Sequence, residues 1–265
     1  MIRISEDLDA LSGAAAEDVV GAAERAVRER GRFTMSLAGG STPRRLYEML
    51  ATAYRDRMPW SATHIFFGDE RCVPPTDRAS NYHMANEALL SRVPIPDAQV
   101  HRIRGELAPL EAAREYGRLL RREFDASHAT EQTRSGSAST SLAQTFDVAL
   151  LGVGPDGHTA SLFPGSPALD ERKHWAMEVE APDYIAPPRE RVTLTFPALN
   201  ASRAVIFLVA GEEKQRVVGE MLGADATLAS SYPAAHVHGT QRTVWLLDRA
   251  AATAIDRSSG RSRAR

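Results

Sequence analysis

The sequence predicts an α/β fold with a doubly wound, mostly parallel sheet, helices on both faces and room for a small subdomain. Three observations indicate this class. Short apolar, β-branched runs recur along the chain, each run ends in a glycine-rich or charged loop, and each loop leads into a segment with apolar residues at three- and four-residue spacing. With 265 residues, 43% of them hydrophobic, the chain is long enough to bury one large core.

The expected strands and helices alternate along the chain. Apolar runs predict strands at 33–38, 63–67, 146–151, 204–209 and 243–247. Helical periodicity predicts helices at 14–30, 44–54, 110–124 and 214–222. The proline-rich run 181–188 suits neither a helix nor a central strand, so we expect a surface loop that could flank a site.

We expect one domain over residues 1–250. The polar, small-residue segments 126–144 and 251–265 carry too little apolar surface to offset the entropy lost on ordering. They therefore predict a flexible insert and a disordered tail.

Charge and cysteine content exclude several classes of function. The formal net charge is −2 and the pI is about 6.5, so no basic field favours nucleic acid or an anionic membrane, and phosphate recognition must be local. Acidic residues precede any apolar run at the N-terminus, and Cys72 is the single cysteine. This pattern predicts a protein of the reducing cytoplasm with no internal disulfide and no multi-cysteine zinc site.

The first candidate site follows the predicted strand 33–38. Gly39 and Gly40 let the backbone approach an anion, while Ser41 and Thr42 offer hydroxyls before an amphipathic helix. Free N–H groups at that helix start favour phosphate. A plain capped helix is the alternative, and a Walker loop is excluded because no Gly-Lys-Ser/Thr follows.

The second candidate site follows strand 63–67, where Asp69, Glu70 and Arg71 stand together. Arg71 could stabilise an oxyanion or bind a phosphate, and the carboxylates could hold arginine or sugar hydroxyls. A solvated turn with an internal ion pair is the alternative, favoured more for Glu70 than for the other two. Cys72 is interpreted as a bystander thiol.

The third candidate site is the most specific and follows strand 146–151. Gly152 and Gly154 permit sharp turning, and Asp156 precedes His158 by two residues, close enough to orient its imidazole. An oriented neutral imidazole is a general base near neutral pH. A structural histidine is the alternative, which the glycine-rich strand end disfavours.

Two further cations complete the candidate set. Lys214 opens the predicted helix 214–222, and Arg191 begins another apolar run. Each alone is more typical of a solvated charge. If the loop 39–42 holds a phosphate, Lys214 is the better placed of the two to neutralise it.

At these residues the sequence resembles the 6-phosphogluconolactonase family, which is related to glucosamine-6-phosphate deaminase. Five matching stretches occur in family order between about Met35 and Leu222: SLAGGSTPRRLYEML, FFGDERCVPPTDRASNY, LLGVGPDGHTASLFPGS, RVTLTFPALN and AGEEK. Five ordered matches are far more specific than any one of them. The resemblance implies a Rossmann-like fold and a monomeric enzyme that hydrolyses 6-phospho-D-glucono-1,5-lactone.

The resemblance also assigns roles to the candidate residues. It implies that His158 is the catalytic base supported by Asp156, and that Asp69 and Arg71 contribute to the pocket. It places a further group around the substrate phosphate: Gly39, Gly40, Ser41, Thr42 and Lys214, with Arg191 nearby. No organic cofactor or metal is implied.

Several alternatives remain at this stage. The related deaminases carry a glutamate five residues after the histidine, where this chain has Phe163, which favours the lactonase. A non-catalytic sugar-phosphate sensor would keep the phosphate loop without turnover. A serine nucleophile is disfavoured because no Gly-x-Ser-x-Gly occurs, and metal hydrolysis because no His-Glu-x-x-His occurs.

Overall fold

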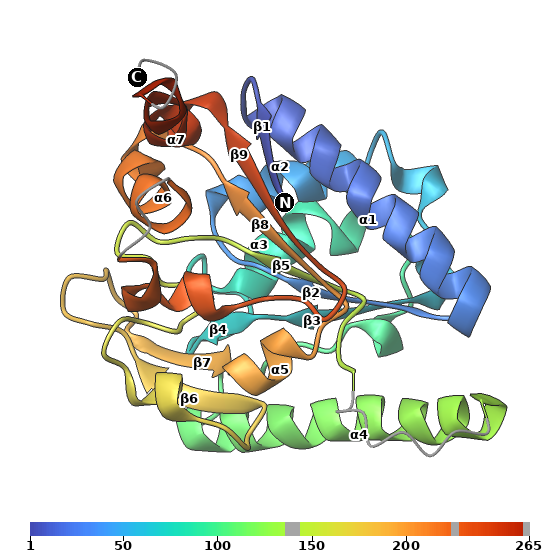
Figure 1. The fold of residues 1–265 in the computed structure, drawn as a ribbon. Helices are drawn as coiled ribbons and strands as arrows, with labels where there is room; N and C mark the ends of the chain where they lie inside the picture. The colour runs from blue at the N-terminus through green and yellow to red at the C-terminus, as the bar shows by residue number, and fades with distance from the viewer. Residues whose placement is uncertain (136–143, 224–227, 262–265) are drawn as a thin grey trace.

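A computed structural model describes residues 1–135, 144–223 and 228–261 (Figure 1). The strands are β1 (Ile2–Ser5), β2 (Phe33–Leu37), β3 (Thr63–Phe67), β4 (Asp69–Arg71), β5 (Val148–Leu151), β6 (Ala176–Glu180), β7 (Glu190–Leu194), β8 (Ala204–Val209) and β9 (Arg242–Asp248). The α-helices are α1 (Leu8–Arg30), α2 (Ser41–Leu50), α3 (Asn81–Ala88), α4 (Pro109–Ser135), α5 (Phe196–Asn200), α6 (Gln215–Leu222) and α7 (Arg249–Arg261).

A six-stranded parallel sheet forms the centre of the molecule, in the order β1-β9-β8-β5-β2-β3. The chain runs from the edge strand β1 across to β2 and the opposite edge strand β3, and then returns toward β1 through β5, β8 and β9. Because crossovers between parallel strands are right-handed, this reversal places the helices of the outgoing crossovers on one face and those of the returning crossovers on the other. Figure 1 shows α1 and α2 on one side of the sheet and α4 and α6 on the other, which confirms the predicted doubly wound fold.

The reversal occurs between the neighbouring strands β2 and β5. The connection after β2 leaves toward one face, and the connection after β5 leaves toward the other. Two such loops diverge and leave a crevice at the carboxyl ends of the strands, where ligands bind in open α/β sheets. The fold therefore positions a site between residues 39–42 and residues 152–158.

A three-stranded antiparallel sheet, β4-β7-β6, lies beside this crevice and forms the small subdomain. Its strand β4 continues from β3 through Gly68, whose N–H donates to Leu37 O (2.9 Å) and whose carbonyl accepts from Leu194 N (2.8 Å). Gly68 thus joins both sheets. Helix α4 packs along β6 and β7, as the lower part of Figure 1 shows.

Two buried tyrosines fix the carboxyl ends of neighbouring strands. The Tyr47 hydroxyl accepts from Ala38 N (2.9 Å) and donates to Ala38 O (2.8 Å). The Tyr116 hydroxyl does the same for Phe67, at 2.9 and 3.0 Å. Backbone groups beyond the last ladder bonds of β2 and β3 are therefore satisfied by side chains rather than by water.

The structure differs from two sequence expectations. Of the expected flexible insert 126–144, residues 126–135 continue α4, because no proline or glycine occurs between positions 126 and 135. Of the expected disordered tail 251–265, residues 251–261 belong to α7, because Ala251 and Ala252 are fully buried and Asp248 accepts from Ala251 N (2.7 Å). Residues 136–143 and 262–265 lie outside the described part of the chain.

Candidate active site

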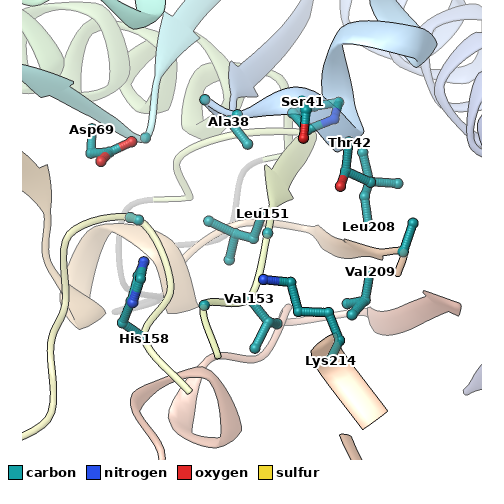
Figure 2. Close-up of a pocket in the computed structure, with 18 of the residues that line it drawn as sticks. Ala38, Ser41, Thr42, Asp69, Leu151, Val153, His158, Leu208, Val209 and Lys214 are labelled. Carbon is teal, nitrogen blue, oxygen red and sulfur yellow. The ribbon is translucent and has the colours of Figure 1, made fainter. Parts of the chain in front are cut away.

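A cavity of about 270 Å³ occupies the crevice between β2 and β5 (Figure 2). Its wall combines all three strand-end loops with the turn that precedes α6. Of the ten candidate site residues, eight line it: Gly39, Gly40, Ser41, Thr42, Asp69, Arg71, His158 and Lys214. Asp156 and Arg191 lie behind the wall and contact or pair with lining residues.

His158 and Asp156 form a close pair at the end of β5. Asp156 Oδ1 lies 2.5 Å from His158 Nδ1 and 3.2 Å from the His158 backbone N. The two side chains are 22% and 20% exposed, so the pair is partly shielded from water. No residue in the described chain hydrogen-bonds the other ring nitrogen, Nε2, and Figure 2 shows the imidazole facing the cavity. A ring held at Nδ1 by a carboxylate presents Nε2 as a base.

Two glycines make room for this pair. A Cβ on Gly154 would lie 2.2 Å from Cε1 and Nδ1 of His158 and 2.8 Å from Asp156 Oδ1. Gly157 adopts φ +81°, and a Cβ there would lie 2.1 Å from the Tyr232 ring. The glycine-rich turn is therefore required for the imidazole to pack against the loop.

The predicted loop 181–188 does flank the site. The Tyr184 hydroxyl donates to Asp156 Oδ2 (2.7 Å), although the Tyr184 side chain is largely exposed. Burial alone would raise the pKa of Asp156, but the hydrogen bonds from His158 and Tyr184 and the charge of His158 outweigh it and hold that pKa well below its ordinary value. Burial and the Asp156 carboxylate together raise the pKa of Tyr184 to about 12. Asp156 is therefore ionised and Tyr184 protonated near neutral pH.

The opposite wall is suited to an anion. Gly40 begins α2 with φ 98° and has no side chain to cap it, so the N–H groups of the first turn stay available to a ligand. Figure 2 shows the hydroxyls of Ser41 and Thr42 and the ammonium of Lys214 pointing into the same space. The Lys214 side chain is 17% exposed, and Glu213 Oε1 lies 3.7 Å from its Nζ. Helix dipole, hydroxyls and cation converge here.

Asp69 holds three segments of the wall together. Its carboxylate is buried and accepts from Ser161 Oγ (2.6 Å) and Asn81 Nδ2 (3.0 Å). Asn81 also donates to Asp69 O (2.9 Å) and packs against Gly39, where a Cβ would lie 2.0 Å from Asn81 Oδ1. Asp69 thus links β4 to the loop after β5 and to the start of α3.

Arg71 and Arg191 face each other across the β4–β7 pair. Arg71 Nη1 donates to Ala79 O (2.5 Å), and Arg71 Nε is buried with no hydrogen-bond partner in the described chain. Arg191 is 5% exposed, and burial together with the charge of Arg71 lowers its pKa. Two adjacent guanidinium groups favour an anion in contact with Arg71, whereas Arg191 does not reach the cavity wall.

Glu70 does not belong to the cavity. Its carboxylate accepts from Asn81 N (2.7 Å) and Tyr82 N (2.8 Å), the first N–H groups of α3. Burial raises the pKa of Glu70, and this effect exceeds the opposite effect of the hydrogen bonds, which lower it. Burial likewise raises the pKa of the Cys72 thiol to about 11, which agrees with a bystander role.

Sequence reasoning missed three residues around the site, namely Asn81, Ser161 and Tyr184. Asn81 and Ser161 lie in two of the stretches that resemble the lactonase family, so a buried polar residue in a matched stretch was the available signal. For Tyr184 the only signal was the proline-rich loop.

Comparison with known proteins places the chain among sugar-phosphate enzymes. Residues 6–245 match the family described as glucosamine-6-phosphate isomerases/6-phosphogluconolactonase. A 6-phosphogluconolactonase of Mycobacterium tuberculosis is 41% identical over 256 residues, which are 96% of this chain and 98% of that protein. The crystal structure of 6-phosphogluconolactonase from Thermotoga maritima superposes with a TM-score of 0.73 at 33% identity, covering 94% of this chain and 99% of that one.

The same fold also occurs in the sister activity. A solved monomeric glucosamine-6-phosphate deaminase has a TM-score of 0.74 at 20% identity, over 96% of this chain and 99% of that chain. At that identity the likeness shows the fold alone, so the fold does not distinguish a lactonase from a deaminase.

Within the described residues, no helix is both long and apolar enough to cross a membrane.

Proposed function

The chain belongs to the family of glucosamine-6-phosphate isomerases and 6-phosphogluconolactonases, and we propose that its cavity hydrolyses 6-phospho-D-glucono-1,5-lactone to 6-phosphogluconate. The observation that carries this proposal is the His158–Asp156 pair at the end of β5, facing an anion-binding wall across one cavity. A lactone with a phosphate at its far end has this polarity: an electrophilic carbonyl for the base and a dianion for the opposite wall.

Binding begins at the phosphate. The first turn of α2, the hydroxyls of Ser41 and Thr42 and the ammonium of Lys214 receive it. Arg191, buried behind Arg71, adds long-range positive potential rather than contact. Anchoring the phosphate fixes the lactone ring relative to His158, so the reacting groups are already oriented when the reaction begins.

Hydrolysis then uses the histidine twice. His158 Nε2 takes a proton from a water molecule, and the water oxygen bonds to C1 of the lactone. Asp156 stabilises the imidazolium at Nδ1, and Arg71 or backbone N–H groups of the glycine loops stabilise the oxyanion on C1. When the bond from C1 to the ring oxygen breaks, the imidazolium returns its proton to that oxygen. The acid formed at C1 ionises at neutral pH and releases one proton.

Phe163 supports the lactonase over the deaminase. Its ring is buried and lies 4.8 Å from the His158 ring, centroid to centroid. The deaminase relay requires a carboxylate at this position, and a phenyl ring cannot transfer a proton. The apolar contact instead shields one face of the imidazole from water.

The test is the rate of 6-phosphogluconolactone hydrolysis above the spontaneous background, followed in a pH-stat for wild type and His158→Ala. We expect a large acceleration by wild type and a loss of roughly 10²- to 10⁴-fold in the variant. Full turnover by a folded His158→Ala protein would remove His158 as the base. Wild type that binds 6-phosphogluconate without any acceleration would instead be a sensor.

A further inference from the structure

Away from the cavity, two histidines and a glutamate converge from three elements. His64 lies at the second position of β3, and Glu123 lies on α4. His101 lies in the segment that connects α3 to α4. One ligand atom from each can be chosen so that all three lie within 4.8 Å of one another. Since the active-site cavity opens at the carboxyl ends of the strands, His64 is at the opposite end of β3, about 10 Å of strand from Phe67.

We propose that His64, His101 and Glu123 form a binding site for a divalent transition metal ion, with Zn²⁺ as the best match, that ties α4 to the edge of the main sheet. Two imidazole nitrogens and a carboxylate with an open fourth position are a common zinc ligand set. This inference does not rest on the proposed function, and the ion has no part in the hydrolysis.

The distance between the two imidazoles fits one tetrahedral ion. His64 Nδ1 and His101 Nε2 are 3.2 Å apart and share a hydrogen bond, in which one imidazole N–H donates to the other ring nitrogen and which a bound ion would replace. Zinc–nitrogen bonds of about 2.0–2.1 Å at a tetrahedral angle separate two ligand nitrogens by about 3.3–3.4 Å. The carboxylate must approach by roughly 1.5 Å, which a rotamer change of a glutamate on a helix surface can supply.

Packing holds one of the two imidazoles in place. The ring of Phe66 stacks on His101 (4.5 Å between centroids) and limits its motion.

Two arginines compete for the glutamate. Arg32 Nη2 lies 3.4 Å from Glu123 Oε2, and Arg122 Nε lies 3.5 Å from Glu123 Oε1. Both contacts are long for an ion pair, so an ion can displace one of them. The Arg32 charge nevertheless opposes a bound cation, and its removal should strengthen metal binding.

The sequence gives little sign of this site because its ligands are far apart in the chain. His64 and His101 are separated by 37 positions and Glu123 lies further on, so no short metal motif arises. From the sequence we expect no metal ligands, and this proposal departs from that expectation because its three ligands meet only in the folded chain.

The experiment is isothermal titration of the metal-free full chain with Zn²⁺ at pH 7.5. Wild type should bind one ion, and the affinity should fall about tenfold or more in His64→Asn and in Glu123→Gln. His174→Asn is the matched control, because His174 also pairs with a glutamate (2.8 Å to Glu171) but lacks a third ligand among the described residues. It should bind like wild type.

Two variants make the result decisive. Arg32→Gln should bind Zn²⁺ severalfold more tightly, a gain that an unfolded protein cannot produce, so the test survives if His64→Asn fails to fold. His158→Asn should leave the affinity unchanged. Loss of binding in His158→Asn, retention in His64→Asn and Glu123→Gln, or no saturable binding by wild type would each overturn the proposal.

Discussion

Two histidine–carboxylate pairs of similar geometry lie in different surroundings. His158 Nδ1 is 2.5 Å from Asp156, and His174 Nδ1 is 2.8 Å from Glu171. The pKa of each carboxyl is lowered; for Glu171 it falls to about 2, chiefly through backbone hydrogen bonds from His174 and Lys173. Yet the His158 side chain is 22% exposed and the His174 side chain 74%.

The difference teaches that the pair alone does not make an active site. The pair at His158 ends a parallel strand, rests on Gly154 and faces Lys214 and the start of α2 across a cavity. The pair at His174 lies on a surface turn, where water screens its charges. If these surroundings account for the difference, changes at the His158 pair should reduce activity and matched changes at the His174 pair should not.

The largest effect is expected from the carboxylate. Asp156→Asn should lower kcat/KM by about 10²- to 10³-fold, because the amide neither stabilises the imidazolium nor fixes the tautomer. Glu171→Gln is the control and should change kcat/KM by less than about twofold. An Asp156→Asn variant with unchanged kcat/KM would contradict the role of Asp156.

Next comes the glycine beneath the imidazole. Gly154→Ala places a Cβ 2.2 Å from the His158 ring and should displace it, lowering kcat by about 10²-fold. Gly117→Ala is the matched control: no atom lies within 4 Å of the added Cβ on α4, and the change should stabilise the protein by about 0.5–1 kcal/mol. Thermal melts and kcat measured on both variants separate folding from positioning. Unchanged kcat in Gly154→Ala would show that the ring tolerates the shift.

The lysines extend the comparison, because each pair has one nearby. Lys214→Gln should raise KM by about 10- to 100-fold with a smaller change in kcat, since a charge-assisted contact to the phosphate is lost. Lys173→Gln, beside His174, should leave both constants unchanged. The variant at 214 should also lose preference for the phosphorylated lactone over the unphosphorylated one. Retained preference would place the phosphate elsewhere.

The smallest effect is expected at Tyr184, whose hydroxyl donates to the Asp156 carboxylate of the His158–Asp156 pair. Tyr184→Phe removes the hydrogen bond to Asp156 Oδ2 and should lower kcat about threefold. The pKa of Asp156 should rise but stay below its ordinary value, because the hydrogen bond and charge of His158 remain, so the loss should be similar at neutral and mildly acidic pH. A pH series of kcat for the variant and wild type measures this. Equal rates at all pH values would make Tyr184 a surface contact only.

Much of this site could be predicted from the sequence, because ligands in open α/β sheets bind at the carboxyl ends of the strands. Residues after parallel strands meet at one edge of a sheet, whatever the strand order, and so Gly39, Asp69 and His158 could be grouped before their neighbours were known. The order β5-β2, which defines the crevice, is tertiary information.

What the sequence did not reveal depends on contacts between distant segments. Asn81 reaches Gly39 only because α3 packs beside α2, and Tyr184 reaches Asp156 from a loop that leaves the small sheet. That sheet was missed because β4 has three residues, too few for a pattern of period two. Arg191, which we expect near the phosphate, lies on β7 and pairs with Arg71 of β4, a pairing between distant segments.

The tyrosine clamps at Ala38 and Phe67 have a consequence for local motion. Amide protons exchange with solvent when a segment opens, and strand ends beside a binding loop usually open readily. Here the amides of Ala38 and Phe67 are bonded to buried hydroxyls, so their exchange should be slow, close to that of the strand interiors. The loops that follow can then move around substrate while their anchors remain fixed.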